Sequence, residues 1–194
     1  MDRIENINTT GSITTALFRT NDVAEVNILR RAIMSEIETY AIDIVIFNTN
    51  TSPRHDEVIA QRLGLVVIDN TTFVPPVDGD MKVHIDVQGP RIFTTKDIPD
   101  LPFVCHPNIA ELRVGQRITC DCIVKKGQGK THIKWRPISV FTFKAVEGGH
   151  QISFKGVGMM TGEEIIRQGL AKMGDAARRT PMTIFSHQLV PANM

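Results

Sequence analysis

Residues 27 to 68 constrain the fold of this chain more than any other stretch of its sequence. An amphipathic segment ends at Ile37, a nearly unbroken apolar segment runs from Ala41 to Asn48, and a polar turn leads into a second short amphipathic segment. Apolar spacings of three and four residues predict helices. A short apolar run favours a strand that is buried on both faces or that crosses between two domains. The order helix, strand, turn, helix therefore predicts a protein of mixed α and β structure.

The first helix is expected over residues 22–37, with Asn21 or Asp22 as its N-cap. At about 100° per residue, one face of this helix is a continuous apolar stripe. The stripe comprises Val26, Leu29, Ile33 and Ile37. Arg30 flanks the stripe, whereas Arg31 points away from it. A solvated surface charge is the simplest interpretation of Arg31, and contact with another protein is the alternative.

Further elements follow from local patterns along the chain. Strands are expected at residues 12–20, 81–87, 91–95, 117–124, 138–145 and 151–157. A short helix is expected over residues 56–63, capped by Ser52 with Pro53 at its first helical position. The basic, glycine-rich residues 125–130 are expected to form a turn. The chain after residue 180 has no clear period, which favours a docking arm or disorder.

The last helix is expected to start at Thr161, because Thr161 and Glu164 have the spacing of a capping box. Its apolar face comprises Ile166, Leu170, Met173 and Ala177. Two amphipathic helices with wide apolar faces are expected to need a partner that covers them.

Composition excludes several classes of protein. The 194 residues carry 22 basic and 21 acidic side chains, so that no basic excess indicates nucleic-acid binding. No apolar run is long enough to span a membrane, and the first residues lack the apolar segment of a signal peptide. Three cysteines are an odd number without a disulfide-like spacing, which favours a reducing intracellular setting.

The candidate metal and catalytic residues have simpler interpretations. Cys120 and Cys122 share one face of an expected strand with apolar neighbours, which predicts buried thiols rather than zinc ligands. Adjacent helical residues such as Asp56 and Glu57 diverge by about 100° and rarely hold one ion. A triad of Asp100, Cys105 and His106 lacks any feature that would position a base or an oxyanion hole. We therefore expect no catalytic residue, no cofactor and no metal.

The basic segment Lys125-Lys126-Gly127-Gln128-Gly129-Lys130 has the composition of a phosphate-binding loop but not its spacing. A hairpin turn with solvated lysines and a patch that docks a partner are the two remaining interpretations.

Several motifs together resemble a known family. In order, they are Asn27-x-Leu29-Arg30-Arg31, Ala41-Ile42-Asp43, Asn50-Thr51-Ser52, Asp56-Glu57 and Arg62-Leu63-Gly64-Leu65, followed later by Leu112-Arg113-x-Gly115-Gln116, Val124-Lys125-Lys126-Gly127, Lys130, His132 and Lys134-Trp135-x-Pro137. Their order and spacing resemble the alpha-type subunits of multisubunit RNA polymerase. These are the eukaryotic third-largest subunit, its archaeal counterpart and the bacterial alpha N-terminal domain. Glu38 and Val67 stand where the family usually has proline.

The resemblance implies an α+β fold with a discontinuous dimerisation domain, a sheet plus two long helices, formed by residues 1–44 and 146–194. An inserted β-rich domain would occupy residues 45–145. The implied function is that of a non-catalytic assembly platform, which pairs with a smaller homologous subunit and docks the second-largest subunit and, through it, the catalytic subunit. A stand-alone regulatory binding protein derived from the same fold is the alternative. Direct binding to DNA or to a membrane is not expected.

The resemblance also implies two sets of contact residues. Contact with the second-largest subunit is expected for Arg31, Asn50, Asp56, Glu57, Arg62, Lys130, Lys134 and Trp135. Dimerisation is expected for Val26, Leu29, Arg30, Ile33, Ile37, Ile166, Leu170 and Met173.

Some relatives carry a cysteine-rich zinc loop or an iron–sulfur cluster, and the latter needs about four thiolates. This chain has no cysteine between Leu65 and Val104, so neither cofactor is expected. The missing loop and the two lost prolines suggest a divergent lineage such as a large DNA virus. The protein is expected to be intracellular, in the nucleus or the cytoplasm, or in the virion if it is viral.

Overall fold

Two separate hydrophobic cores organise the computed structural model of the chain, which describes residues 3–74 and 80–179. In chain order the elements are β1 (Ile4–Thr10), β2 (Ile13–Phe18), α1 (Val23–Arg31), the π-helical turn η1 (Ala32–Glu36), β3 (Glu38–Asn50), α2 (Asp56–Leu65), β4 (Met81–Gln88), β5 (Arg91–Thr94), η2 (Thr95–Asp97), β6 (Asn108–Leu112), β7 (Arg117–Gln128), η3 (Ile133–Trp135), β8 (Ile138–Val146), β9 (Gly149–Gly156) and α3 (Gly162–Arg179). The expected mixture of α and β structure is confirmed.

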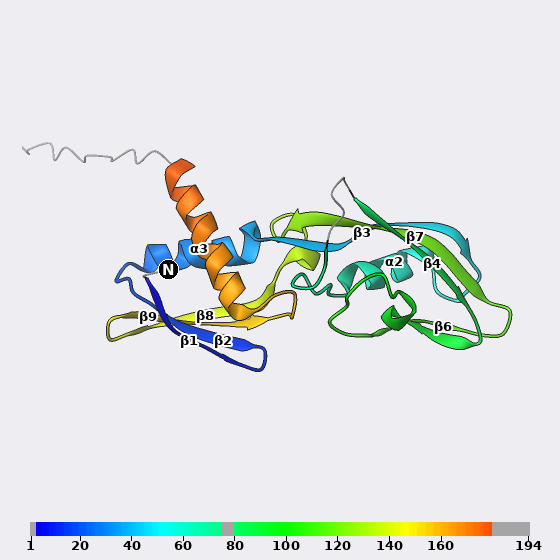
Figure 1. The fold of residues 1–194 in the computed structure, drawn as a ribbon, viewed down its shortest axis with the longest axis horizontal. Coiled ribbons are helices and arrows are strands. Elements are labelled where there is room, and N and C mark those ends of the chain that lie inside the picture. Colours follow the sequence, from blue (N-terminus) through cyan, green and yellow to red (C-terminus); the bar gives the residue numbers. More distant parts are fainter. Residues whose placement is uncertain (1–2, 75–79, 180–194) are drawn as a thin grey trace, which may run out of the picture.

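The first core lies between a sheet and two helices. The sheet has the antiparallel order β1-β2-β9-β8, so strands from both ends of the described chain lie side by side in it. Helices α1 and α3 cross the same face of this sheet, as Figure 1 shows. The buried side chains are Ile4, Ala16, Phe18, Val26, Leu29, Ile33, Ile37, Ile138, Ile152, Phe154, Ile165 and Ile166.

The second core lies under the sheet β3-β7-β4, where α2 and the small sheet β5-β6 cover it. The alternation expected for residues 81–87 is confirmed, because Val83, Ile85 and Val87 of β4 are buried. The face of β7 that carries Cys120 and Cys122 is buried as expected. Strand β3 starts directly after Ile37 of the first core and carries Ile42 of the second, so it links the first unit, built around the first core, to the second unit, built around the second core (Figure 1).

Helix α1 begins as its sequence predicts. The Asp22 side chain accepts a hydrogen bond from the Ala24 N–H at 2.8 Å, which caps the helix. The regular helix ends at Arg31, and η1 follows until the chain becomes extended at Ile37. The apolar stripe of the helix has no exposed surface at Val26, Leu29, Ile33 or Ile37. The expectation that a partner must cover this stripe is therefore wrong, because the sheet and α3 already cover it.

Helix α2 lacks the cap expected from the sequence. It starts at Asp56, and His55 at the cap position makes no capping hydrogen bond through its side chain. Ser52 belongs instead to the preceding loop, where its hydroxyl group donates to the Asn50 Oδ1 at 2.7 Å. A hydroxyl group that can bond within its own turn competes with the role of a helix cap.

Most of the basic segment 125–130 is extended strand, contrary to expectation, and only Gly129 and Lys130 lie in a turn. Strand β7 continues to Gln128, so Lys126 pairs with Tyr40 and Gln128 pairs with Glu38 of β3. The chain turns only after Gln128. Strand β3 starts at Glu38, earlier than its apolar run suggests, and its partner strand therefore extends into the glycine-rich segment.

Helix α3 begins at Gly162 and keeps half of the expected capping box. The Glu164 N–H donates to the Thr161 hydroxyl group at 3.3 Å, but the Glu164 carboxylate accepts from Arg167 and Gln168 instead of the cap. Ile166 is buried, and Leu170 is half-buried. The Ala177 side chain and the tail after residue 179 lie outside the described part. No helix of the described residues is long and apolar enough to cross a membrane.

Candidate protein-docking surfaces

Arg31 lies at the end of α1 with its side chain exposed, whereas Arg30 is half-buried. The Arg30 Nε donates to the Asn27 Oδ1 at 3.3 Å, so this arginine is used within the helix. The Arg31 guanidinium forms no hydrogen bond or ion pair with any other residue that the structure describes. The orientation expected from the helical period is confirmed, and Arg31 can reach a partner.

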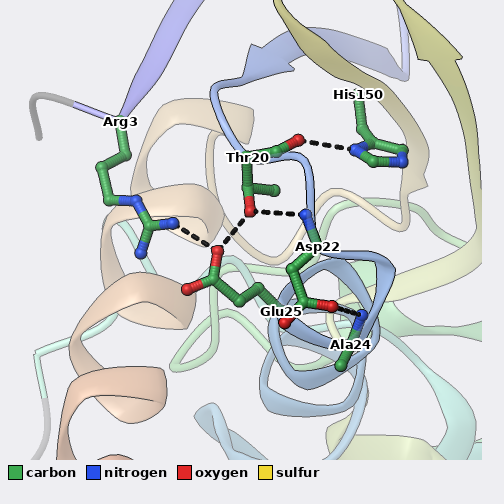
Figure 2. Close-up of polar contacts among 6 residues, drawn as sticks. All are labelled: Arg3, Thr20, Asp22, Ala24, Glu25 and His150. Carbon is green, nitrogen blue, oxygen red and sulfur yellow. Dashed lines mark hydrogen bonds and ion pairs between the residues drawn. The ribbon is translucent and has the colours of Figure 1, made fainter.

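A polar network holds the start of α1 and thereby fixes the direction of the helix (Figure 2). The Glu25 carboxylate accepts hydrogen bonds from the Arg3 guanidinium and from the Thr20 hydroxyl group. The hydrogen bond from Arg3 and, to a smaller extent, the hydrogen bond from Thr20 lower the pKa of the Glu25 carboxyl group. The buried His150 ring places its Nδ1 at 2.9 Å from the Thr20 carbonyl oxygen, and since a carbonyl can only accept, Nδ1 donates. The network joins β1, β9 and α1.

Lys134 and Trp135 lie where β3 leaves the first core. The Lys134 ammonium lies 2.6 Å from the Asp43 carboxylate and 4.5 Å from the centre of the Trp135 ring. The buried Trp135 donates its indole N–H to the Lys125 carbonyl oxygen at 3.2 Å, and its own carbonyl oxygen accepts from the Thr39 hydroxyl group at 2.7 Å. These two residues, predicted to contact a partner, thus also stabilise the chain internally.

The other lysines of this region also pair with acidic side chains. Lys125 lies 3.6 Å from Asp80, and the remaining two pair with glutamates from η1 and β3. The Lys126 ammonium lies 2.8 Å from the Glu38 carboxylate, and Lys130 lies 3.4 Å from Glu36. Lys126 lowers the pKa of Glu38, and Glu38 raises the pKa of Lys126. An open depression of about 280 Å³ lies beside the Lys126–Glu38 pair, lined by Glu38, Lys126, Gly127, Gln128 and Thr131. Opposite charges already neutralise much of the expected basic patch.

The remaining predicted contact residues surround α2. The Asn50 Nδ2 donates to the Asp56 carboxylate at 2.6 Å and to the Arg54 carbonyl oxygen at 2.8 Å, which closes the loop before the helix. The Arg62 guanidinium donates to the carbonyl oxygens of Asn108 and Ile109, which ties α2 to β6. Glu57 is exposed. Asn50 and Arg62 therefore shape the surface that Asp56 and Glu57 expose.

The predicted contact residues thus form two groups, one at the end of α1 and the start of β3, and one around α2. Sequence reasoning missed three acidic residues that pair with lysines and one amide that donates to an acidic residue: Glu36, Glu38 and Asp43, and Gln128, which donates to Glu38. The usable signal was the charge opposition between residues 36–43 and residues 126–134. The sequence alone hides this charge opposition, because residues 125–130 have the composition of a turn and not of a strand that pairs with β3.

The three cysteines of the chain lie at two separate places in the structure. Cys120 and Cys122 are fully buried on β7, and the neighbouring Cys120 thiol together with burial raises the pKa of Cys122. Cys105 is exposed in a separate loop. Within residues 3–74 and 80–179, no three His, Cys, Asp or Glu side chains come together as metal ligands. The expectation of a metal-free protein stays a prediction.

These features define a class: a two-core protein of mixed α and β structure whose notable surface residues suit contact with other proteins. No family model matches the chain. Several curated proteins are nevertheless similar to it in sequence. Subunit Rpo3 of the DNA-directed RNA polymerase of Methanocaldococcus jannaschii is 30% identical over 149 residues, which cover 74% of this chain and 76% of that protein.

Two further relatives agree. Rpo3 of Pyrococcus horikoshii is 32% identical, over 71% of this chain and 57% of that protein. RPB3 of RNA polymerase II of Schizosaccharomyces pombe is 32% identical, over 63% of this chain and 52% of that protein. The chain therefore spans only about half the length of these two. The chain belongs to the Rpo3/RPB3 family of DNA-directed RNA polymerase subunits, which confirms the alpha-type resemblance and the expectation of a subunit rather than a separate enzyme. None of the three relatives supports the expected viral origin.

Proposed function

We propose that this chain is a non-catalytic assembly platform of a DNA-directed RNA polymerase. It pairs with a smaller homologous subunit, docks the second-largest subunit, and holds the catalytic subunit through that contact. The observation that carries the proposal is the exposed Arg31 at the end of a helix whose opposite face is fully buried. An exposed arginine on a rigid helix can form paired hydrogen bonds with carboxylate or backbone oxygens of a partner.

The dimerisation unit in this proposal is the four-stranded sheet with α1 and α3. Residues 1–44 and 146–194 are the expected parts of this unit, and we add β8 to the proposal because β8 pairs with β9 over residues 138–146. Helix α3 rises past α1 in Figure 1, and its residues Leu170 and Met173 are half-buried. These two side chains would be in direct contact with the smaller homologous subunit. The buried residues beneath that surface would support it from inside the first core: Val26, Leu29, Ile33, Ile37 and Ile166.

The inserted β-rich unit would help Arg31 to bind the second-largest subunit. Asp56, Glu57 and Lys130 are exposed and would take part directly. Four further residues would contribute indirectly, because their internal contacts keep the docking surface in shape: Asn50, Arg62, Lys134 and Trp135. The formal net charge of +1 supports binding to protein rather than directly to DNA. The protein would then act in the compartment of its polymerase, the nucleus or the cytoplasm.

The test is the substitution Arg31→Ala in a chain that is co-expressed with the smaller homologous subunit. We expect the heterodimer to form normally and its capture of the second-largest subunit to weaken by a factor of about 30 to 4,000. Truncating one partner of a buried interfacial charge pair costs about 2–5 kcal/mol. The measurement is a pull-down of each partner by the tagged chain, followed by titration of the complex.

The matched control is Arg19→Ala, which removes an exposed arginine that pairs with Glu5 in the same unit. This control should bind both partners as the wild type does. Normal capture of the large subunit by Arg31→Ala, or loss of the heterodimer, would refute the proposed role. A chain that captures neither subunit in its wild-type form would support the alternative, a stand-alone regulatory binding protein.

A further inference from the structure

The end of the Arg31 helix is capped by a segment that is almost a hundred residues away in the sequence. A helix leaves its last carbonyl groups without partners inside the helix. Here the Lys130 N–H donates to the Ser35 carbonyl oxygen at 3.1 Å, and the Gln128 Nε2 donates to the Glu36 carbonyl oxygen at 3.2 Å. Both acceptors belong to η1, which directly follows Arg31. The capping segment Gln128–Lys130 continues β7 of the second unit.

Gly129 permits this close approach because it has no side chain. A Cβ atom at residue 129 would overlap the Met34 carbonyl oxygen, which is a backbone atom and cannot rotate away. The Gly129 backbone is not in the left-handed region. The position therefore needs glycine for its size rather than for its conformation.

Side chains strengthen the same contact. The Gln128 amide also donates to the Glu38 carboxylate at 3.2 Å, and the Lys130 ammonium pairs with Glu36. A second tie lies elsewhere on β3, where the Tyr40 N–H donates to the Asn70 Oδ1 at 2.7 Å and the Asn70 N–H donates to the Met159 carbonyl oxygen at 2.8 Å. The second unit is therefore attached to the first both at η1 and at the loop between β9 and α3.

We propose that Gln128–Lys130 is a positioning element, which caps η1 and fixes Arg31 relative to the inserted β-rich unit. This inference rests on the proposed function, because it requires one partner to contact Arg31 and the inserted unit together. The apparent affinity of such a partner is the intrinsic affinity multiplied by the fraction of molecules in the competent arrangement. If loosening the cap lowers that fraction to about a tenth, capture of the partner weakens about tenfold.

The test compares Gly129→Ala with the wild type in two measurements. The first is the distance distribution between spin labels at Glu111→Cys in the second unit and Glu163→Cys in the first, in a Cys105→Ser background. Glu111 and Glu163 are exposed, and Cys120 and Cys122 are buried away from the label. The second measurement is the titration of the second-largest subunit with the co-expressed heterodimer.

We expect Gly129→Ala to broaden the distance distribution and to weaken capture about tenfold, with the heterodimer retained. Gln128→Ala, which removes two hydrogen bonds and adds no clash, should change both measurements in the same direction. Val83→Ala is the control for lost stability, because it creates a cavity in the second core away from η1 and should leave both measurements unchanged at a temperature where it is folded.

An unchanged distance distribution in both cap variants would overturn the inference. A broadened distribution with unchanged capture would also overturn it, because the arrangement would then not matter for docking. If the wild-type heterodimer captures no large subunit, the proposed function fails, and the role in docking fails with it. The distance measurement would still report separately whether the cap holds the two units together.

Discussion

At the scale of single residues, close packing explains positions that local sequence patterns do not. Gly127 lies under Trp135, and a Cβ atom at residue 127 would overlap three atoms of the indole ring. We predict that Gly127→Ala lowers the free energy of unfolding by about 1–3 kcal/mol, since overpacking a filled site forces the ring or the strand to move. Chemical denaturation, with tryptophan fluorescence as the signal from the only tryptophan, measures the change.

Gly174 provides the matched control for this prediction. It lies in α3, and a Cβ atom there would meet no other atom within 4 Å. Gly174→Ala should raise the free energy of unfolding by about 0.5–1 kcal/mol, because alanine is the better helix former. Equal effects of the two substitutions would mean that the indole ring does not fill the space above Gly127.

The sequence predicted the exposure of Arg31 and the burial of Cys120 and Cys122, because helical and strand periods decide these orientations locally. It could not predict that Lys134 pairs with Asp43 or that Gly129 lies against Met34. Both contacts join residues more than 90 positions apart, and only the pairing of β3 with β7 brings them together.

At the scale of elements, the apolar face of α1 stabilises the chain itself. Leu29 has no exposed surface and packs in the first core. We predict that Leu29→Ala lowers the free energy of unfolding of the chain without any partner by about 2–5 kcal/mol, the usual cost of a large cavity. Thermal or chemical unfolding of the isolated chain is the measurement.

Ile28 is the control, because the adjacent side chain on the same helix is 42% exposed. Ile28→Ala should lower the free energy of unfolding of the isolated chain by much less than Leu29→Ala does. If Leu29→Ala leaves the isolated chain as stable as the wild type and only separates the heterodimer, the packing described for α1 is incorrect.

Long elements with a clear period were predictable, and short or polar ones were not. The alternation in β4 and the stripe in α1 identify them without tertiary information. Strand β1 carries mostly polar residues and β6 has only five residues, so neither has a strong local pattern. The end of β7 has the composition of a turn, but pairing with β3 keeps it extended, which is a case of tertiary contacts overriding local propensity.

At the scale of the whole molecule, the stability of the chain should be sensitive to acid through the ion pair between β3 and β7. Lys126 lowers the pKa of Glu38, so the folded state binds the Glu38 proton more weakly than the unfolded state does. The ion pair therefore contributes stability above the ordinary glutamic acid pKa of about 4.3, and this contribution disappears as the pH falls below that value. We predict that the free energy of unfolding falls less steeply with decreasing pH for Glu38→Gln than for the wild type.

Unfolding by urea at a series of pH values between about 6 and 3 measures this difference. Glu147→Gln, at an exposed position in the turn between β8 and β9, is the control and should follow the wild-type curve. Salt should reduce the effect, because the Glu38 side chain is 39% exposed. Parallel curves for Glu38→Gln and the wild type would show that this ion pair does not stabilise the folded chain.

The central claim is that this chain assembles a polymerase, and purification of the tagged chain from its own cells tests it most directly. We predict that the second-largest and the catalytic subunits of a DNA-directed RNA polymerase co-purify in equal amounts with the chain, together with one smaller homologous subunit. We also predict that the purified complex synthesises RNA on a DNA template. A chain that is recovered alone, or with other proteins but without those subunits, would contradict the account.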